Sequence, residues 1–598
     1  MNRIAEIPMG STVLDAIRSA EITFESICGG KGECGKCRVI HVRGDIDTGI
    51  LENTPRLTPA EIAGRYVLAC KTQVLSNAEF IIPVESRIDT PKILLTASWK
   101  SSGLQPAVAR YSTGSQSEQP GKYRSFSLTG YSGKRPDMTR DQYEQLRDSP
   151  ISFDVTITSA SGYPEVLFFE DSGSKDPIFG IAIDLGTTTV VGALVDLSTG
   201  KVVAEASVLN RQITYGEELI TRIVHARVPE GREQLRKAAL ESINAVIDLV
   251  AGDRNVSHER IADATIAGNT VMLYLLAGID THSLELVDAN VPRVPARYRA
   301  STLGIGIYPQ AYVYCLPNVS RFVGGDAVGD VLVSGMHRSS DLSLLVDLGT
   351  NGEIVFGNNE WLVCSSCASG PAFEGAGIRS GMRAMKGAIE HVAIDASTGK
   401  AALKTIGNSR PIGICGSGII DAAAEMAAAG ILDFTGRIVE GKPGVRRGPT
   451  GDLEYVLAPM EETGTGRDIA ITSVDLAYLM DSKAAACGAV GVLMNKYRIS
   501  LREVRNVFLA GAFGSFTDLE QVTAFGILPQ FPHASYHPLG NGSLGGAYMA
   551  LTSLSARREA EEIAQKMVYV DLLVESDFIE EYTAALYIPG KKEYFPPD

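Results

Sequence analysis

Four cysteines near the start of the chain have the spacing of a metal-cluster site. Three of them lie in ICGGKGECGKCRVI, and 32 residues separate the third from the fourth, which gives the pattern C-x5-C-x2-C…C. Four thiolates are the usual ligand set of a [2Fe–2S] cluster, and glycines between the thiolates let the backbone curl around the cluster. The pattern predicts a [2Fe–2S] cluster held by Cys28, Cys34, Cys37 and Cys70.

Two other uses of these four cysteines stay open, a zinc site and buried free thiols. A zinc site more often shows two separated C-x2-C pairs. The other five of the nine cysteines lie between Cys315 and Cys487, and Cys364 and Cys367 among them form a C-x2-C pair directly after an apolar segment. That pair fits either buried structural thiols or a redox or metal-binding dithiol.

The unit Asp-Leu-Gly-Thr occurs twice, in FGIAIDLGTTTVVGALVD and in LLVDLGTNGEIVFGN. Each copy follows an apolar strand pattern, and a glycine turn there brings backbone N–H groups close to an anion. Asp184 and Asp347 would repel a phosphate but can hold Mg²⁺ against it. Such self-similarity predicts two related lobes that face one cleft. The residues expected to bind the nucleotide in these loops are Gly186, Thr187, Thr188, Thr189, Gly349, Thr350 and Asn351.

Further glycine-rich segments complete the predicted nucleotide site. NVFLAGAFGSF is an apolar strand ending in Gly511, Ala512 and Phe513, whose small residues allow a base and ribose to approach the backbone. Its expected counterpart in the first lobe is ATIAGNTVM. Gly416, in GICGSGIID, lies beside an expected helix start, where anions are favoured.

The residue that activates water is harder to choose from the sequence. Asp326, in VGGDAVGD, and Glu353, in DLGTNGE, are the candidates for the general base, although each could equally be a turn or surface carboxylate. Glu374, in GPAFEGAGI, follows the second phosphate loop and is expected near the cleft.

Composition excludes some classes of partner. The 598 residues carry a net charge of −15, and a nucleic-acid partner usually calls for a basic face. No secretory signal is visible, and no apolar run approaches the roughly 18 residues of a membrane span. These features predict a cytoplasmic protein without a nucleic-acid or membrane partner.

The order of the segments predicts a multidomain α/β and α+β chain. Residues 1–85 read as a ferredoxin-like domain and 86–110 as a linker. Residues 111–176 read as a small middle domain, with a helix over MTRDQYEQLRDS and strands over SFDVTITSA and PEVLFFE. Residues 177–598 read as a two-lobed ATPase.

The motifs together resemble those of the reductive activators of corrinoid proteins. In that family an N-terminal β-grasp [2Fe–2S] ferredoxin domain is fused to an ATPase of the actin, sugar-kinase and Hsp70 superfamily (ASKHA). The matching segments are the C-x5-C-x2-C motif, DLGTTT, DLGTNGE, GPAFEGAGI and LAGAFGSF. The chain has neither a GxxxxGK[ST] loop nor a GxGxxG turn after a strand, so the two nucleotide-binding folds that carry these motifs are excluded.

The resemblance implies an activity, cofactors and partners. The expected reaction is ATP-dependent reduction of cob(II)amide to cob(I)amide in a corrinoid protein of a methyltransferase or acetyl-CoA pathway system. It would use the [2Fe–2S] cluster, ATP, Mg²⁺ and an external low-potential electron donor, and the family comparison suggests a homodimer. Two alternatives remain: a small-molecule kinase or ATPase with a redox-sensing ferredoxin domain, and an electron-transfer module with a degenerate ATPase fold.

Overall fold

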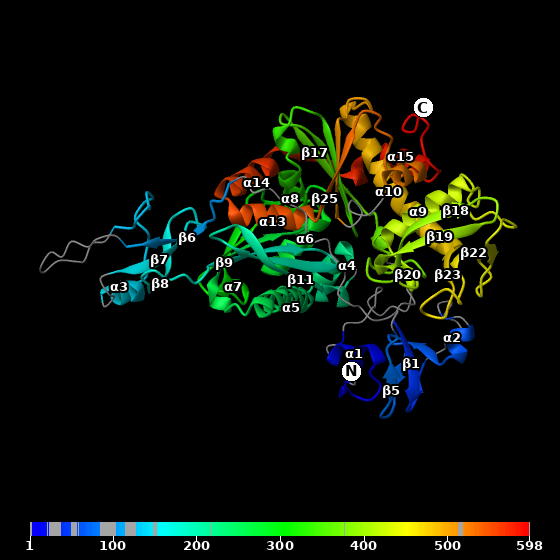
Figure 1. The fold of residues 1–598 in the computed structure, drawn as a ribbon, viewed down its shortest axis with the longest axis horizontal. Helices are drawn as coiled ribbons and strands as arrows, with labels where there is room; N and C mark the ends of the chain where they lie inside the picture. Colours follow the sequence, from blue (N-terminus) through cyan, green and yellow to red (C-terminus); the bar gives the residue numbers. More distant parts are fainter. Residues whose placement is uncertain are drawn as a thin grey trace, which may run out of the picture.

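The computed structural model describes most of the chain and is drawn in Figure 1. The described residues are 3–20, 22, 37–48, 57, 59–83, 103–113, 127–147, 152–216, 218–375, 377–511 and 518–596. Four residues predicted to bind cofactors, Cys28, Cys34, Ala512 and Phe513, lie outside the described residues.

The N-terminal domain is a small sheet with two short helices. Its central three strands have the order β3-β1-β5 and are antiparallel, and β2 pairs with β4. Val13, Leu14, Val39 and Leu68 are buried in its core. The elements are α1 (Val13–Ser19), β1 (Arg38–Arg43), β2 (Ile46–Asp47), α2 (Pro59–Ala63), β3 (Tyr66–Leu68), β4 (Gln73–Val74) and β5 (Glu79–Ile81).

The small α+β unit predicted between the ferredoxin-like domain and the ATPase is present. It consists of β6 (Val108–Ser112), α3 (Arg140–Arg147), β7 (Phe153–Thr158) and β8 (Glu165–Asp171), and its strands form an antiparallel sheet in the order β6-β7-β8. The predicted helix and both predicted strands are confirmed. The first strand begins inside the range 86–110 that was expected to be a linker, so the unit starts earlier than the predicted residue 111.

This unit is attached to the first ATPase lobe by ion pairs. Glu170 of β8 accepts from Arg110 of β6 at 3.0 Å and from Arg260 of the first lobe at 2.7 Å. Glu165, also on β8, pairs with Arg299 and accepts a 2.8 Å hydrogen bond from the hydroxyl of Tyr312. Since Glu165 and Glu170 are partly or largely buried, these pairs are better protected from solvent screening than surface ion pairs.

The first lobe of the ATPase is a six-stranded sheet in the order β11-β10-β9-β12-β14-β13. Its strands are β9 (Phe179–Leu185), β10 (Thr189–Asp196), β11 (Lys201–Leu209), β12 (Ile261–Ala267), β13 (Ala296–Arg299) and β14 (Tyr312–Cys315). Its helices are α4 (Leu219–Ala226), α5 (Pro229–Arg254), α6 (Thr270–Ala277), α7 (Ala300–Leu303) and α8 (Gly325–Ser334). The central strand β9 is buried on both faces, as its continuous apolar run predicts.

The second lobe is built on a matching sheet in the order β25-β24-β15-β16-β17-β26. Its strands are β15 (Ser343–Leu348), β16 (Gly352–Gly357), β17 (Leu362–Cys367), β24 (Asn506–Ala510), β25 (Ser535–Gly540) and β26 (Met567–Tyr569). Two smaller sheets, β19-β18-β20 and β21-β22-β23, extend it; their strands are β18 (Ala388–Asp395), β19 (Lys400–Thr405), β20 (Gly413–Ile414), β21 (Val445–Arg447), β22 (Leu453–Ala458) and β23 (Ile469–Thr472). The helices are α9 (Gly416–Ala428), α10 (Ser473–Tyr497), α12 (Leu519–Phe525), α13 (Gly542–Thr552), α14 (Leu554–Lys566) and α15 (Phe578–Ala585).

The two large sheets repeat one strand pattern. In the first, β9 pairs with β10 antiparallel on one side and with β12 parallel on the other. In the second, β15 pairs with β16 antiparallel and with β24 parallel. The prediction of two related lobes is therefore confirmed. The repeat also puts Asp184, near the end of β9, and Asp347, near the end of β15, at equivalent places.

Helices α8 and α13 cross at very close range beside these strand ends (Figure 1). A Cβ atom added to Gly546 of α13 would lie 2.2 Å from the Cα atom of Gly329 of α8. The helices can approach this closely only because both residues are glycine. The crossing holds the start of α8, which carries Asp326, against the start of α13.

Helix α10 is a long apolar helix in the second lobe. It is long and apolar enough to cross a membrane, with a mean hydropathy of 1.3 in its most apolar window. However, 83% of that window is buried inside the protein, and α10 packs in the core of the second lobe. Helix α10 is thus a core helix, and the cytoplasmic location stays a prediction.

We expect the α8–α13 crossing to tolerate no side chain. Replacing Gly546 by Val should force the two helix backbones apart and cost about 1–3 kcal/mol or more of stability. Gly252→Ala, in the solvent-facing helix α5, is the matched control, because an added Cβ there meets no atom within 4 Å. That control should be neutral or stabilising by about 0.4–1 kcal/mol. The two apparent melting temperatures, measured by thermal unfolding, check the prediction, and equal values would contradict it.

Candidate functional site

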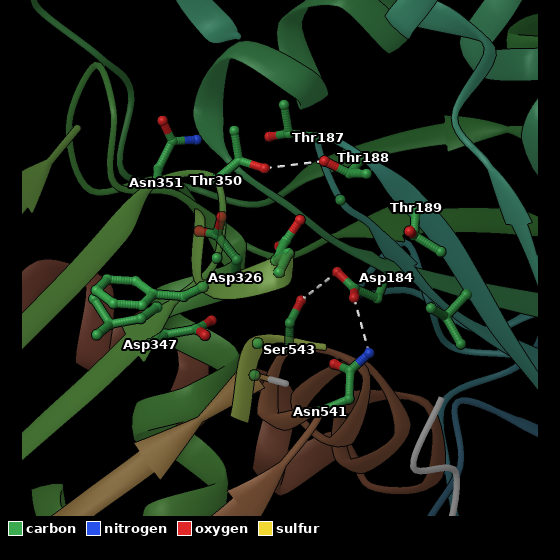
Figure 2. Close-up of a pocket in the computed structure, with 18 of the residues that line it drawn as sticks. Asp184, Thr187, Thr188, Thr189, Asp326, Asp347, Thr350, Asn351, Asn541 and Ser543 are labelled. Atoms are coloured by element: carbon green, nitrogen blue, oxygen red, sulfur yellow. Dashed lines mark hydrogen bonds between the residues drawn. The ribbon is translucent and has the colours of Figure 1, made fainter. Parts of the chain in front are cut away.

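A cleft between the two lobes collects all the described residues predicted to bind or process a nucleotide (Figure 2). The predicted residues that line it are Asp184, Gly186, Thr187, Thr188, Thr189, Asp326, Asp347, Gly349, Thr350, Asn351, Glu353, Gly416 and Gly511. They come from segments up to 327 residues apart in the sequence, between Asp184 and Gly511. The strand repeat and the α8–α13 crossing bring these segments together.

The two predicted phosphate loops touch each other across the cleft. The hydroxyl groups of Thr188, in the first loop, and Thr350, in the second, are 2.9 Å apart and share a hydrogen bond (Figure 2). A hydroxyl can both donate and accept, so each can exchange this partner for a phosphate oxygen. The two loops are therefore close enough to contact one phosphate chain from both sides.

Asp184 is held by two residues that the sequence reading missed. Its carboxylate accepts hydrogen bonds from Asn541 Nδ2 at 2.9 Å and from Ser543 Oγ at 2.7 Å (Figure 2). Asn541 also caps α13, since its Oδ1 accepts from the Leu544 N–H group. Burial raises the pKa of Asp184, and the two hydrogen bonds oppose that rise. The glycine-rich segment GNGSLGG before α13 is the signal that could have revealed these residues.

The acidic side chains of the cleft crowd one another. Burial, reinforced by the neighbouring carboxylates, raises the pKa of Asp347 to about 7 and that of Asp326 to about 6. The same causes raise the pKa of Glu353 well above its ordinary value. Asp330 of α8, which the sequence reading missed, is fully buried beside them, and neither of its carboxylate oxygens has a donor among the described residues. Such a cluster favours binding of a cation, which would stabilise the ionised carboxylates.

Both candidates for the general base have raised pKa values. A base works best when it is ionised near the operating pH. Asp326 meets this condition, and its Oδ1 is fixed by N–H groups of Ala327 at 2.8 Å and Gly324 at 3.2 Å. Burial beside Asp326 and Asp347 raises the pKa of Glu353 well above its ordinary value. Asp326 and Glu353 both line the cleft, and the backbone fixes the carboxylate of Asp326 in place.

Glu374 lines the cleft, as the sequence reading expected. Burial raises its pKa, while Arg383 and hydrogen bonds from Thr350 oppose the rise. Arg383 also lines the cleft and was not predicted. It brings a permanent positive charge into an otherwise acidic cavity.

Two of the predicted glycines have no room for a side chain. A Cβ on Gly416, at the start of α9, would lie 1.8 Å from the carbonyl oxygen of Phe373. Gly511 has a φ of +74°, and a Cβ there would lie 2.4 Å from Oδ1 of Asp347. Both glycines keep the backbone close to the cleft, as a loop that accepts a flat ligand requires.

The two described cysteines of the predicted cluster lie side by side. Cys37 and Cys70 have Sγ atoms 3.3 Å apart, and both side chains are buried. Two converging thiols fit neighbouring ligands of one iron–sulfur cluster. Among the described residues no group of three or more His, Cys, Asp or Glu side chains could hold a metal ion by itself. The other two predicted ligands lie outside the described residues.

The second C-x2-C pair lies in the interior of the second lobe. Cys364 and Cys367 are buried on β17. Burial raises the pKa of Cys367 to about 12 and that of Cys364 further still. A thiol must be deprotonated to act as a nucleophile or metal ligand. Of the two open interpretations, the structure therefore favours buried structural thiols.

Among the described residues, Arg467 of the second lobe contacts the ferredoxin-like domain. The guanidinium of Arg467, just before β23, lies 4.6 Å from the ring centre of Tyr66 and 3.6 Å from the carboxylate of Glu61. Glu61 also pairs with Arg38 of β1 at 3.4 Å. The cysteine-bearing domain is thus docked on the lobe that carries the second phosphate loop.

Comparisons with known proteins agree with this architecture. A model of the C-terminal domain of RACo, the ASKHA domain, matches residues 341–597, and a model of the RACo middle region matches 179–339. A model of the 2Fe-2S iron-sulfur cluster binding domain matches 2–75. A solved structure titled reductive activator for corrinoid, iron-sulfur protein is 34% identical, with a TM-score of 0.76 over 99% of this chain and 98% of that chain. The chain belongs to the RACo family of reductive activators of corrinoid proteins.

Two curated relatives of this RACo-family chain are similar along most of their length. The corrinoid activation enzyme RamQ of Eubacterium limosum is 28% identical, with 96% of each chain covered. A protein of Methanosarcina barkeri named [Co(II) methylated amine-specific corrinoid protein] reductase is 24% identical over 66% of this chain and 74% of its own length. The match over nearly the whole chain favours an activator over a small-molecule kinase.

The family models also locate the lobes. The RACo middle region corresponds to the first ATPase lobe, not to the small β6–β8 unit that the sequence reading named a middle domain. The predicted fold class is confirmed: a 2Fe-2S ferredoxin domain, a middle region and a C-terminal ASKHA domain.

We expect the cluster to depend on the convergent pair and not on the second C-x2-C. Cys37→Ser should lower the iron content and the visible absorbance of the anaerobically purified protein by at least about half, because it removes one of four thiolates. Cys364→Ala should leave the iron content and the absorbance unchanged, since that thiol is buried and burial raises its pKa. A Cys364→Ala protein that loses its visible absorbance while remaining folded would contradict this assignment.

Proposed function

We propose that this RACo-family protein uses ATP hydrolysis to drive the one-electron reduction of cob(II)amide to cob(I)amide in a corrinoid protein. Family membership supports the corrinoid reductase activity. The observation that carries the ATP-dependent part is the cleft in which two phosphate loops, joined by the Thr188–Thr350 hydrogen bond, meet a cluster of carboxylates. A cleft of this composition suits a magnesium-bound nucleotide.

The four N-terminal cysteines hold a [2Fe–2S] cluster, which supplies one-electron transfer. One electron comes from an external low-potential donor and one is delivered to cobalt, so Co(II) becomes Co(I) without loss or gain of other atoms. About 60 mV of uphill one-electron transfer lowers the equilibrium constant tenfold. Hydrolysis of ATP to ADP and phosphate can offset such a deficit only if it changes the state of the acceptor.

The chain's residues divide the work on ATP between the two lobes. Asp184 and Asp347 would hold a magnesium ion, which would neutralise charge on the phosphates, and the hydroxyls of Thr187, Thr188 and Thr350 are placed to donate hydrogen bonds to those phosphates. The crowded carboxylates support this role, because a buried acidic cluster is costly without a cation. Asp326 orients and deprotonates the attacking water.

Coupling to the corrinoid protein follows from the two-lobed cleft. The lobes grip the partner in one nucleotide state and release it in the other, and the gripped state alters the coordination of cobalt, for example by removing an axial ligand. The two states must differ in affinity for the partner, because otherwise the nucleotide would shift no equilibrium.

The partner is a corrinoid protein of a methyltransferase system. This proposal rests on the relatives, since the names of both curated proteins refer to corrinoid activation or a corrinoid protein. The alternative partner is a corrinoid protein of the acetyl-CoA pathway. The similar solved structure supports this alternative, because it is named as an activator for a corrinoid, iron-sulfur protein. The electron donor and the homodimer stay predictions.

Asp184→Ala tests the coupling directly. It should lower the rate of Mg²⁺·ATP-dependent cob(I)amide formation at least about 100-fold, as expected when a group that positions the metal and phosphates is lost. The visible spectrum of the cluster should not change, because Asp184 lies in the other half of the chain. The assay follows cob(I)amide absorbance under anaerobic conditions after mixing reduced protein with candidate cob(II)amide proteins.

Asp248→Asn provides the matched control, because this carboxylate lies on the outside of α5 with 68% of its side chain exposed. It should reduce the corrinoid protein at the wild-type rate. Full ATP-dependent activity in Asp184→Ala would refute the proposal that ATP hydrolysis in this cleft drives the reduction. Calorimetry on the wild type separates the remaining alternative, since a degenerate ATPase fold would bind no nucleotide.

Binding of Mg²⁺·ADP should release protons at pH 6.5. Asp347 has a pKa of about 7 in the unliganded cleft, so it is largely protonated at this pH, and a cation stabilises its ionised form. Raising the pH from 6 to 8 should therefore tighten Mg²⁺·ADP binding until the carboxylates are ionised. Calorimetry in buffers of different ionisation enthalpy counts the protons, and Asp347→Asn should release fewer. Proton uptake by the wild type would be inconsistent with a cation at these carboxylates.

A further inference from the structure

A buried polar network lies beneath the first phosphate loop, outside the set of residues that line the cleft. Asn210, Gln212 and Arg222 are each fully buried. Gln212 Oε1 accepts from Arg222 Nη1 at 3.0 Å, and Gln212 Nε2 donates to the carbonyl of Leu235 at 2.9 Å. Burying a guanidinium and two amides costs free energy unless their hydrogen bonds are made. A buried network of this kind therefore points to a structural or functional role for these side chains.

The network holds three successive carbonyl groups of the loop. Gly186 accepts from Asn210 Nδ2 at 2.8 Å, and Thr187 accepts from Arg222 Nη2 at 2.5 Å. Thr188 accepts from the backbone N–H of Asn210 at 2.9 Å. Hydrogen bonds from Asn210 and Arg222 thus hold the carbonyl groups of three successive residues of the DLGTTT turn.

The direction of these carbonyls fixes the direction of the neighbouring N–H groups. In a trans peptide the C=O and N–H bonds point in opposite directions. When the carbonyls of Gly186 and Thr187 point down to Asn210 and Arg222, the N–H groups of Thr187 and Thr188 point the other way. Both threonines line the cleft, so their N–H groups form a concave pair of donors for an anion.

We propose that Arg222 and Asn210 are positioning residues that preset the first phosphate loop for the phosphates of a nucleotide. This inference rests on the proposed binding of ATP in the cleft. Neither side chain touches the nucleotide; each acts through a peptide group. The hydrogen bond from the charged guanidinium also polarises the Thr187–Thr188 peptide, which makes the Thr188 N–H a stronger donor. A permanent positive charge below the loop offsets part of the repulsion between the phosphates and the acidic cluster.

Arginine is the residue that this place requires. Besides the Thr187 carbonyl, its Nε donates to the carbonyl of Gly216 at 2.8 Å, and its Nη1 donates to Gln212. The planar guanidinium fork can serve these acceptors at once, whereas a lysine ammonium has a single centre from which to donate. Lysine would retain the charge and only part of the geometry.

The experiment measures two affinities on the full-length protein, that of a non-hydrolysable Mg²⁺·ATP analogue by calorimetry and that of adenosine by saturation-transfer NMR. Arg222→Met should weaken binding of the analogue by about 10-fold or more, in line with loss of a charged hydrogen bond, and leave adenosine binding within about twofold. Arg222→Lys should recover part of the loss. Asn210→Asp, which replaces the donor to Gly186 by an acceptor, should weaken the analogue in the same selective way.

Arg557→Lys is the matched control, because Arg557 is another buried arginine of the ATPase and pairs with Asp263 at 2.6 Å away from the loop. It should lower the melting temperature without changing either affinity. The inference is overturned if Arg222→Met and Arg222→Lys bind the analogue as the wild type does, or if they lose adenosine and the analogue equally. If Arg222→Met does not fold, Arg222→Lys and Asn210→Asp decide the question. A wild-type protein that binds no Mg²⁺·ATP analogue would instead refute the proposed function.

Discussion

The close crossing of α8 and α13 is the constraint on which the cleft depends. Gly329 and Gly546 let the two helix backbones touch, and this contact brings together the helix starts that carry Asp326 and Asn541. Asn541 and Ser543 in turn hold Asp184 at the end of β9. The crossing thus lies beside the cleft that the two strand-end carboxylates, Asp184 of the first lobe and Asp347 of the second, line together.

Crowding of carboxylates follows directly from that constraint. Asp326, Asp330, Asp347 and Glu353 come from α8, β15 and β16, and all four have raised pKa values because they are buried close together. A protein retains such a costly cluster where a cation or proton compensates it. The same crowding raises the pKa of Asp326 to about 6 and that of Glu353 well above its ordinary value.

The ferredoxin-like domain and the ATPase are joined in one chain and also in space. Arg467 contacts both Glu61 and Tyr66, so the cysteine-bearing domain rests on the second lobe. A cation between a carboxylate and an aromatic face gives a specific but modest contact.

The sequence by itself determined the chemistry of this protein, because its motifs are local. Short motifs predicted the kinds of ligand: the C-x5-C-x2-C pattern predicted a cluster, and the two Asp-Leu-Gly-Thr turns and Gly416 predicted a nucleotide site. The repeat of one turn predicted two lobes. Only the tertiary structure decided which distant groups complete the site. Arg222 carries no local signature of its role, since it acts through a contact between α4 and a loop 35 residues earlier. Asn541 holds Asp184 across 357 residues of sequence, and only the fold brings the two together. The raised pKa values of Cys364, Asp326 and Glu353 were also set there, because burial shifts a pKa and burial is a property of the folded chain.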